Sequence, residues 1–136
     1  MTVKPPPAWL VRLNSAVLRR GLRLGSQHLL TVPGRRTGIA RSTPISIATL
    51  DGERYVVAAF ADADWVANVR AAGAGTLARG GRTERITLTE LPVGERAPVL
   101  RAFLGQVRGG VRFFGPRTPD EIVAAADRYP VFRVGT

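Results

Sequence analysis

The segment between residues 33 and 44 carries the side chains that point most clearly to chemistry. Its arginines supply positive charge and forked N–H donors, and its glycines let the backbone turn tightly and expose amide N–H groups. A phosphate group needs this combination in a concave turn. The residues concerned are Gly34, Arg35, Arg36, Thr37, Gly38, Arg41 and Thr43. The segment therefore predicts a phosphate site, and the alternative is a solvated basic loop between two strands.

Two residues further along the chain add a reason to expect a pocket. Trp65 and Asn68 are three positions apart in a segment of helical character, so their side chains are neighbours on one face of the helix. Together they could form a wall beside the basic loop. The alternative is that Trp65 belongs to the core, which is the usual place of a tryptophan on a helix.

The sequence excludes several catalytic and metal-binding devices. It has no cysteine and one histidine, which rules out disulfides, thiolate chemistry, cysteine zinc sites and multi-histidine metal sites. His28 begins an apolar strand, so a core or edge histidine is favoured over a Ser-His-Asp relay. Asp62 and Asp64 precede a helix, where capping explains them better than paired catalysis does. We identify no catalytic side chain and no metal ligand set from the sequence.

The formal net charge of +10 at pH 7 indicates an anionic partner. The candidates are a phosphorylated small molecule, an anionic membrane surface and nucleic acid. Nucleic acid is disfavoured, because no recognised docking motif accompanies the arginines and the two tyrosines offer few stacking platforms. The sequence does not indicate an oligomeric state.

The first part of the chain bears on location. Residues 1–25 predict a basic amphipathic helix, which either packs its leucines on the domain or lies on anionic lipid. We find no apolar stretch of membrane-spanning length and no signal peptide. The expected location is cytoplasmic, with a peripheral position on the inner face of the membrane as the alternative.

The elements that must position these residues follow from hydrophobic periodicity and turn signals. Strands are predicted at 28–32, 42–50, 54–60, 75–78, 83–89 and 130–134. Helices are predicted at 8–24, through 65–70 as far as Gly73, at 95–107 and at 118–128. Asp51-Gly52 and Gly80-Gly81 mark tight hairpin turns. The last helix opens with a capping box, Thr118-Pro119-Asp120-Glu121.

This order of elements predicts the fold class. Helices separate groups of strands, but not one for one as a doubly wound parallel sheet requires. Because hairpins dominate, we expect an α+β fold with a mainly antiparallel sheet. A small barrel with helices across its openings is the simplest way to close such a sheet. The length of 136 residues fits a single domain over residues 1–136.

Several motifs occur in an order that resembles a known family. The first is Gly34-Arg35-Arg36-Thr37-Gly38, followed by Thr43-Pro44-Ile45. After the Asp51-Gly52 turn and the strand at 55–59 comes Trp65-Val66-Ala67-Asn68-Val69-Arg70-Ala71. Together they resemble the deazaflavin-dependent nitroreductase and quinone reductase family, whose members use coenzyme F420. The similarity covers about residues 30–91, and more loosely 129–132, and its specificity lies in the combination of motifs.

The resemblance implies a split β-barrel of the FMN-binding type, with reduced F420 as hydride donor. F420 carries a phosphodiester and a glutamate tail, so an anionic deazaflavin agrees with the net charge. Carried over to this sequence, the phosphate would be held by Arg35, Arg36, Thr37 and Arg41, and Gly38 would belong to the same coenzyme-binding loop. The deazaflavin ring would be lined by Thr43, Pro44, Val57, Ala58, Ala59, Trp65 and Asn68. The proton that accompanies the hydride is expected from water or from the coenzyme.

The chain departs from the family pattern around the acceptor. Phe60 and Ala61 stand where the family has a serine and a lysine, and Phe113 and Phe114 stand in place of tyrosines. We therefore expect Phe60, Phe113 and Phe114 to line an apolar site for a quinone-like acceptor, or for another conjugated or nitroaromatic one. Two other interpretations stay open. They are an FMN-dependent oxidoreductase on the same barrel, and a non-catalytic protein for an apolar ligand such as a fatty acid or haem.

Overall fold

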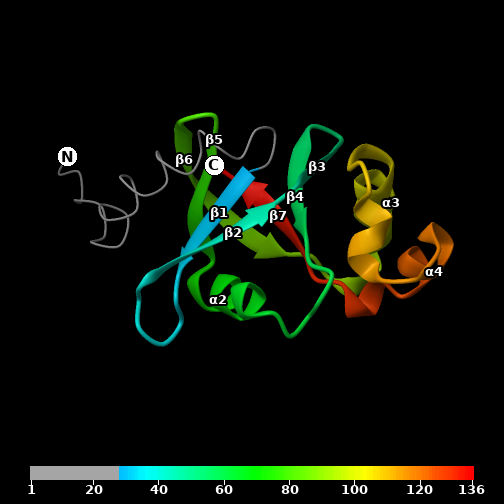
Figure 1. Ribbon diagram of the computed structural model, residues 1–136, viewed down its shortest axis with the longest axis horizontal. Coiled ribbons are helices and arrows are strands. Elements are labelled where there is room, and N and C mark those ends of the chain that lie inside the picture. The colour runs from blue at the N-terminus through cyan, green and yellow to red at the C-terminus, as the bar shows by residue number, and fades with distance from the viewer. Residues whose placement is uncertain (1–27) are drawn as a thin grey trace.

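Seven antiparallel strands form the sheet that positions the rest of the chain (Figure 1). The computed structural model describes residues 28–136, so the helix predicted within residues 1–25 lies outside the described part. The strands are β1 (His28–Pro33), β2 (Ala40–Ile45), β3 (Ile47–Leu50), β4 (Glu53–Val57), β5 (Ala74–Arg79), β6 (Arg82–Glu90) and β7 (Val131–Gly135). Every pairing in this sheet is antiparallel, which confirms the predicted sheet type.

The sheet curls because its two edge strands are consecutive in the chain. The strand order is β2-β1-β5-β6-β7-β4-β3, and Ser46 alone separates β2 from β3. The single strand predicted at 42–50 is therefore two strands, since its first part pairs with β1 and its second part with β4. A sheet whose opposite edges are joined by one residue must bend back on itself. The result is the predicted barrel, split between these two edges.

Two hairpin turns are set by residues that tolerate a positive φ. The β3–β4 turn has Asp51 and Gly52 at φ 52° and 79°, and the β5–β6 turn has Gly80 and Gly81 at φ 57° and 81°. Positive φ at both central residues is typical of a type I′ turn, whose twist matches that of antiparallel strands. Both predicted turns are confirmed.

Residues 28–136 contain three helices, of which the first two pack on the sheet and the third packs on the second. They are α2 (Asp64–Ala72), α3 (Arg96–Gln106) and α4 (Pro119–Ala124), and 3-10 turns lie at Val93–Glu95, Gly110–Phe114 and Ala126–Arg128. As predicted, Gly73 ends α2, at φ 65°. The predicted capping by Asp62 or Asp64 is wrong, because the N-cap is Ala63 and makes no side-chain hydrogen bond. Asp64 is instead the first helical residue, where its carboxylate still favours the helix dipole.

The last helix begins at the predicted capping box, but this helix and the strand β4 both end earlier than expected. The capping box is present, since Thr118 Oγ1 accepts from Glu121 N at 3.2 Å and Thr118 N donates to Glu121 Oε1 at 3.1 Å. The backbone hydrogen bond from Thr118 lowers the pKa of the Glu121 carboxyl. However, α4 ends at Ala124, and a 3-10 turn replaces the helix predicted as far as residue 128. Similarly, β4 ends at Val57 and the chain bends at residue 59.

The core is divided between the two faces of the sheet. The inner cluster comprises Leu30, Val32, Ile45, Val56, Ala58, Val66, Val69, Leu77, Ile86, Leu88, Phe132 and Val134. The outer cluster, under α3 and α4, comprises Ala48, Val99, Leu100, Phe103, Phe114, Ile122, Tyr129 and Val131. Trp65 packs against the inner cluster, so its predicted core role is present as well. The strand β7 thus contributes to both clusters, through Val131 on one face and through Phe132 and Val134 on the other.

The edge strand β3 is covered by a side chain. Gln106 Nε2 donates to Thr49 O at 2.6 Å, and Thr49 N donates to Gln106 Oε1 at 2.8 Å. The Gln106 amide therefore takes the place of a neighbouring strand and satisfies backbone groups that an edge leaves unpaired. This contact also fixes the end of α3 beside the split in the barrel.

Glu90, at the end of β6, joins two helices through arginines. Its Oε1 and Oε2 accept from Arg70 Nε and Nη2 at 2.9 Å and 2.8 Å, which ties α2 to the sheet. Oε2 also accepts from Arg96 Nη2 at 3.1 Å. Arg96 on α3 is 7% exposed and donates to Leu91 O at 3.1 Å. The hydrogen bond from Arg70 is the main reason that the pKa of Glu90 lies below its ordinary value.

We predict that Gly75→Ala destabilises the protein by about 1–3 kcal/mol, because its Cβ would collide with the Thr31 carbonyl oxygen on β1. Gly105→Ala is the control, since its Cβ meets no atom within 4 Å on the exposed side of α3. That variant should gain about 0.5–1 kcal/mol from helix propensity. Urea denaturation measures both free energies of unfolding. Equal stability of the two variants would contradict the close approach of β1 and β5.

We predict that Glu90→Gln lowers the free energy of unfolding by about 1–3 kcal/mol at neutral pH, because two arginines lose a charged acceptor. The folded-state pKa of Glu90 lies below 4.5, so its charge contributes stability above that pH and loses it as the pH falls through the folded value. The stability curves of the two proteins should therefore converge in acid. Glu53→Gln, exposed and without an ion pair within residues 28–136, should show no such pH-dependent difference.

Candidate functional site

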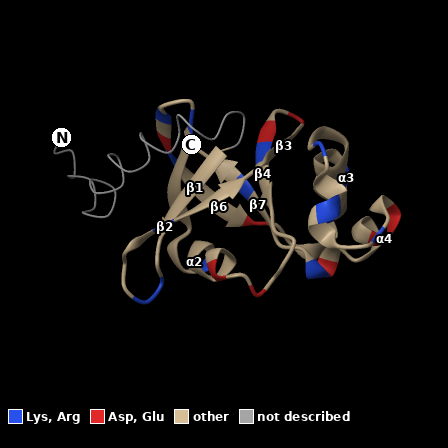
Figure 2. Ribbon diagram, in the orientation of Figure 1, with Lys and Arg blue, Asp and Glu red and all other residues tan. Residues whose placement is uncertain are grey.

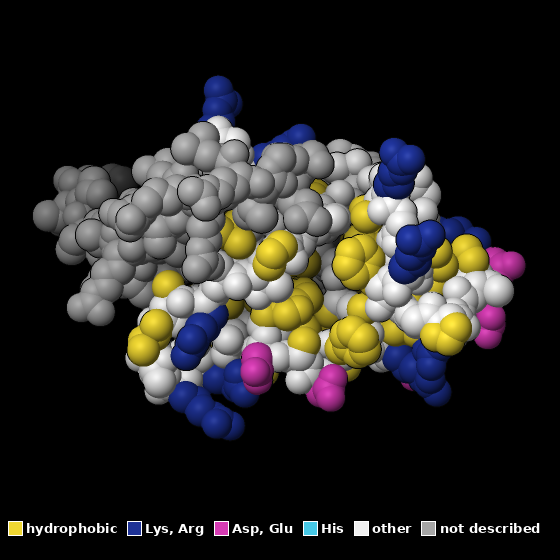
Figure 3. Space-filling model, viewed as in Figure 1, with side chains coloured by type: hydrophobic (Ala, Val, Ile, Leu, Met, Phe, Trp, Pro, Cys, Tyr) yellow, Lys and Arg dark blue, Asp and Glu magenta, His cyan; other side chains and the backbone are white. Residues whose placement is uncertain are grey.

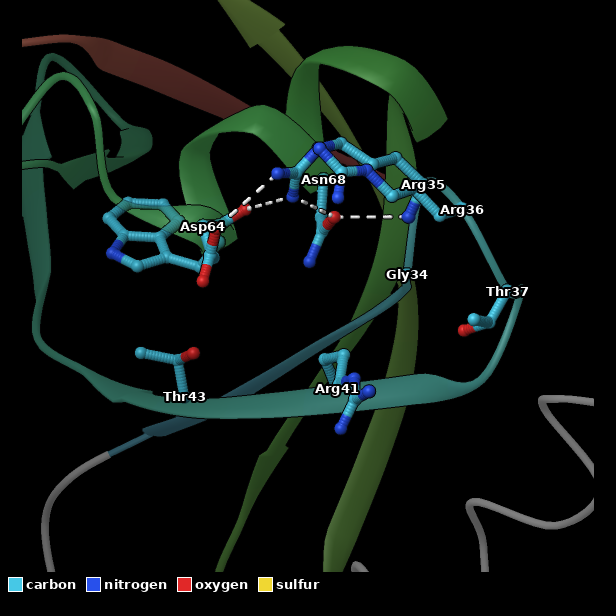
Figure 4. A pocket seen from close by; sticks show the side chains of 9 residues that line it. Gly34, Arg35, Arg36, Thr37, Arg41, Thr43, Asp64 and Asn68 are labelled. Carbon is cyan, nitrogen blue, oxygen red and sulfur yellow. Dashed lines mark hydrogen bonds and ion pairs between the residues drawn. The ribbon is translucent and has the colours of Figure 1, made fainter.

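A cleft of about 490 Å³ opens between the loop after β1 and the helix α2 (Figure 4). Its lining residues are Gly34, Arg35, Arg36, Thr37, Arg41, Thr43, Asp64, Trp65 and Asn68. The loop predicted to bind phosphate and the helix face predicted to wall a pocket are therefore on opposite sides of one cavity. Residues 35–39 of this loop are exposed to solvent.

The loop is shaped by its own hydrogen bonds. Gly34 N donates to Ile39 O at 2.8 Å, and Gly38 N donates to Gly34 O at 2.8 Å. Gly38 has φ 74°, a conformation that favours glycine, and it shapes the loop without lining the cleft. Thr37 Oγ1 accepts from Ile39 N at 3.2 Å, which leaves its O–H free to donate. The loop thus holds its residues in place before any ligand binds.

The three arginines of the loop are in different situations. Arg35 folds onto α2, where Nη1 donates to Asn68 Oδ1 at 2.9 Å and Nη2 lies 3.3 Å from Asp64 Oδ1. Arg36 and Arg41 line the same cleft, and within residues 28–136 neither forms an ion pair. Arg36 and Arg41 are therefore the arginines of this cleft whose charge no carboxylate of the described residues offsets.

A second, apolar cavity of about 270 Å³ adjoins the basic cleft. It is lined by Thr43, Pro44, Ile45, Ser46, Val57, Ala59, Phe60, Trp65, Phe103, Phe113 and Phe114. Thr43 and Trp65 line both cavities, so the two meet at these side chains. An elongated ligand with an anionic end and a flat apolar end fits this pair of cavities.

Phenylalanines line both the inner side and the opening of the apolar cavity. Phe114 is buried and packs edge-on against Phe103 and Tyr129, with ring centroids 5.9 Å and 4.8 Å away. Phe60 and Phe113 are 67% and 53% exposed at the same cavity. Figure 3 shows hydrophobic side chains gathered between the basic loop and α3. The cavity therefore has a fixed inner aromatic wall and an open aromatic rim.

The structure brings most of the predicted site residues to these two cavities. Val57 and Ala59 line the apolar one, but Ala58 between them is 1% exposed in the inner core, with its N donating to Pro130 O at 2.9 Å. The sequence analysis did not identify Ser46, Phe103 or Asp64 as lining residues. Ser46 had no local signal, because the change of strand partner beside it is seen only in the structure, and Phe103 resembles any buried helix residue.

The remaining candidate features lie outside the two cavities. His28 lines neither cavity, and burial, followed by the charges of Arg79 and Arg54, lowers its pKa. Residues 28–136 contain no group of three or more side chains suited to hold a metal. Basic residues also lie outside the cleft, along α3 and on the hairpins (Figure 2). In the described part of the chain no helix has the length and apolarity needed to span a membrane.

The chain folds as an antiparallel split barrel in which a basic cleft adjoins an apolar cavity. Residues 7–114 match the family described as F420H(2)-dependent quinone reductase, and the chain belongs to this family. It is therefore an F420-dependent oxidoreductase, and the resemblance drawn from its motifs is confirmed. The interpretation as a non-catalytic binding protein does not hold.

Solved structures support the fold assignment. An F420-H2 dependent reductase, FDR-A, is 24% identical with a TM-score of 0.54, over 80% of this chain and 93% of that one. A putative 5-nitroimidazole antibiotic resistance protein from Bacteroides thetaiotaomicron is 8% identical with a TM-score of 0.58, over 99% and 81%. A heme binding protein from Mycobacterium smegmatis is 12% identical with a TM-score of 0.53, over 98% and 52%. At these identities the likeness concerns the fold alone. No curated protein matches the chain.

Proposed function

We propose that the protein transfers a hydride from reduced F420 to a quinone-like acceptor, or to another flat conjugated or nitroaromatic compound. The observation that carries the proposal is the junction of the basic cleft with the apolar cavity at Thr43 and Trp65. A coenzyme with an anionic tail and a flat ring needs both environments, and it needs them to be continuous.

The residues present fit the coenzyme. Arg36 and Arg41 would bind the phosphate, with the Thr37 hydroxyl as a further donor, because charged and forked donors suit phosphate oxygens. The ring would lie against Thr43, Pro44, Val57, Ala59 and Trp65. When bound, F420 supplies the hydride chemistry, as redox cofactors do.

The protein then has two tasks, which are to orient the coenzyme ring and to exclude water from the acceptor side. Binding energy gained at Arg36 and Arg41, remote from the reacting ring, fixes the position of that ring and is expressed as rate through orientation. The phenylalanine wall keeps the acceptor side apolar. Ala58 N is committed to Pro130 O, so the Ala59 amide is the one proposed to face negative charge that develops at the ring or acceptor.

Ser46 gives the apolar cavity a hydroxyl near the acceptor. It lies between β2 and β3, and within residues 28–136 its side chain has no hydrogen-bond partner. A donor in an apolar wall polarises a carbonyl more strongly than water does, since the local dielectric is low. We therefore assign Ser46 to orient the acceptor oxygen by a hydrogen bond, while the proton itself comes from water or from the coenzyme.

We predict that Arg36→Ala weakens binding of F420 by about 1.5–3 kcal/mol, as expected for the loss of a charge-assisted hydrogen bond. Arg85→Ala, exposed on β6 and outside both cavities, makes the same change in net charge and should have little effect. Fluorescence titration with oxidised F420, with FMN titrated in parallel, measures the affinities. Equal affinity of the two variants would overturn the phosphate assignment, and tighter binding of FMN would favour the FMN alternative.

For Ser46→Ala we expect kcat with a quinone acceptor to fall about tenfold, the equivalent of one hydrogen bond of about 1.4 kcal/mol, while the affinity for F420 stays unchanged. Ser46→Thr retains the hydroxyl and should recover part of the loss. Steady-state kinetics with reduced F420 and titration with oxidised F420 provide the two readouts. Turnover of Ser46→Ala at the wild-type rate would show that water alone serves the acceptor.

A further inference from the structure

Asn68 lies in the cleft with its side-chain amide held in one orientation. It is 5% exposed, and its Oδ1 accepts from Arg35 N at 3.0 Å and from Arg35 Nη1 at 2.9 Å. An amide oxygen has two lone pairs, so these two donors fill it. Figure 4 shows the amide nitrogen of Asn68 on the side turned away from Arg35. The group that Asn68 leaves for a ligand is therefore Nδ2, a donor.

The guanidinium of Arg35 is held by contacts with α2. Besides Asn68, its guanidinium contacts Asp64, with Nη2 3.3 Å from Oδ1 and Nη1 donating to the backbone oxygen at 3.4 Å. The Asp64 carboxylate offsets the charge of Arg35, whereas within residues 28–136 no carboxylate pairs with Arg36 or Arg41. Although the family resemblance placed Arg35 on the phosphate, these contacts give it a different task.

We propose that Arg35 is a positioning residue, which orients Asn68 so that Nδ2 donates to a phosphoryl or hydroxyl oxygen of the bound coenzyme. If the amide were turned over, Oδ1 would face the anion and repel it, and both hydrogen bonds from Arg35 would be lost. Arg35 thus sets the polarity of the cleft wall by holding one amide. The inference rests on the proposed function, because it needs an anionic ligand in this cleft.

The first test is Asn68→Asp. A carboxylate accepts both hydrogen bonds from Arg35, although it lies one helical turn from Asp64, so the thermal unfolding midpoint should fall little. It presents an oxygen to the cleft in place of Nδ2, so binding of oxidised F420 should weaken at least about tenfold. Wild-type affinity in this variant would overturn the proposal.

The second test is a double-mutant cycle with Arg35→Met and Asn68→Ala, read out by the affinity for oxidised F420. If Arg35 acts through Asn68, Arg35→Met should weaken binding about fivefold in the wild type and less than about twofold in the Asn68→Ala background. An equal factor in both backgrounds would make Arg35 a direct ligand and overturn the inference. If Asn68→Ala does not fold, Asn68→Ser replaces it in the cycle, with the same expected factors.

Arg36→Ala, measured in the same titrations, separates this inference from the proposed function. If Arg36→Ala weakens binding and the cycle is additive, the inference about Arg35 fails and the phosphate cleft stands. If Arg36→Ala and Asn68→Asp both bind F420 as the wild type does, the cleft is not the coenzyme site and both proposals fail. A weakened Arg36→Ala together with a coupled cycle supports both.

Discussion

One stretch of chain, residues 40–50, pairs with β1 through its first half and with β4 through its second half. This double pairing bends the sheet into a barrel and places the split at Ser46. It also brings the end of β2 beside the end of β4, so Pro44 and Val57 line the same cavity. The site exists because one continuous stretch of chain forms both edge strands, and its apolar part lies where the two edges meet.

The helix α2 completes the site from the other side. Val66 and Val69 anchor it in the inner core, and Glu90 holds Arg70 from the end of β6. With that face fixed, Trp65 and Asn68 are turned to the loop after β1. Burial on one side of the helix and the contacts of Arg35 on the other therefore define the width of the cleft. Packing and hydrogen bonding serve the same geometry here.

Sequence reasoning succeeded where the deciding force is local. Asp51-Gly52 forms its turn because those residues accept a positive φ, and Thr118 caps its helix through a residue three positions away. It failed where distant chain segments decide. The break at Ser46 depends on which strand each half pairs with, and the pairing of Arg35 with α2 depends on how the loop folds. Asp64 fitted a capping role locally, yet in the structure it is a partner of Arg35.

The exposed rings of Phe60 and Phe113 have a consequence for selectivity. Phe114 closes the inner side of the pocket, and the outer end of the pocket is open. The pocket therefore restricts the thickness of a bound molecule but not its length. Substituents at the far end of an acceptor would extend into solvent without a steric penalty. Compounds that share one planar head and differ widely in their tails would then be treated alike.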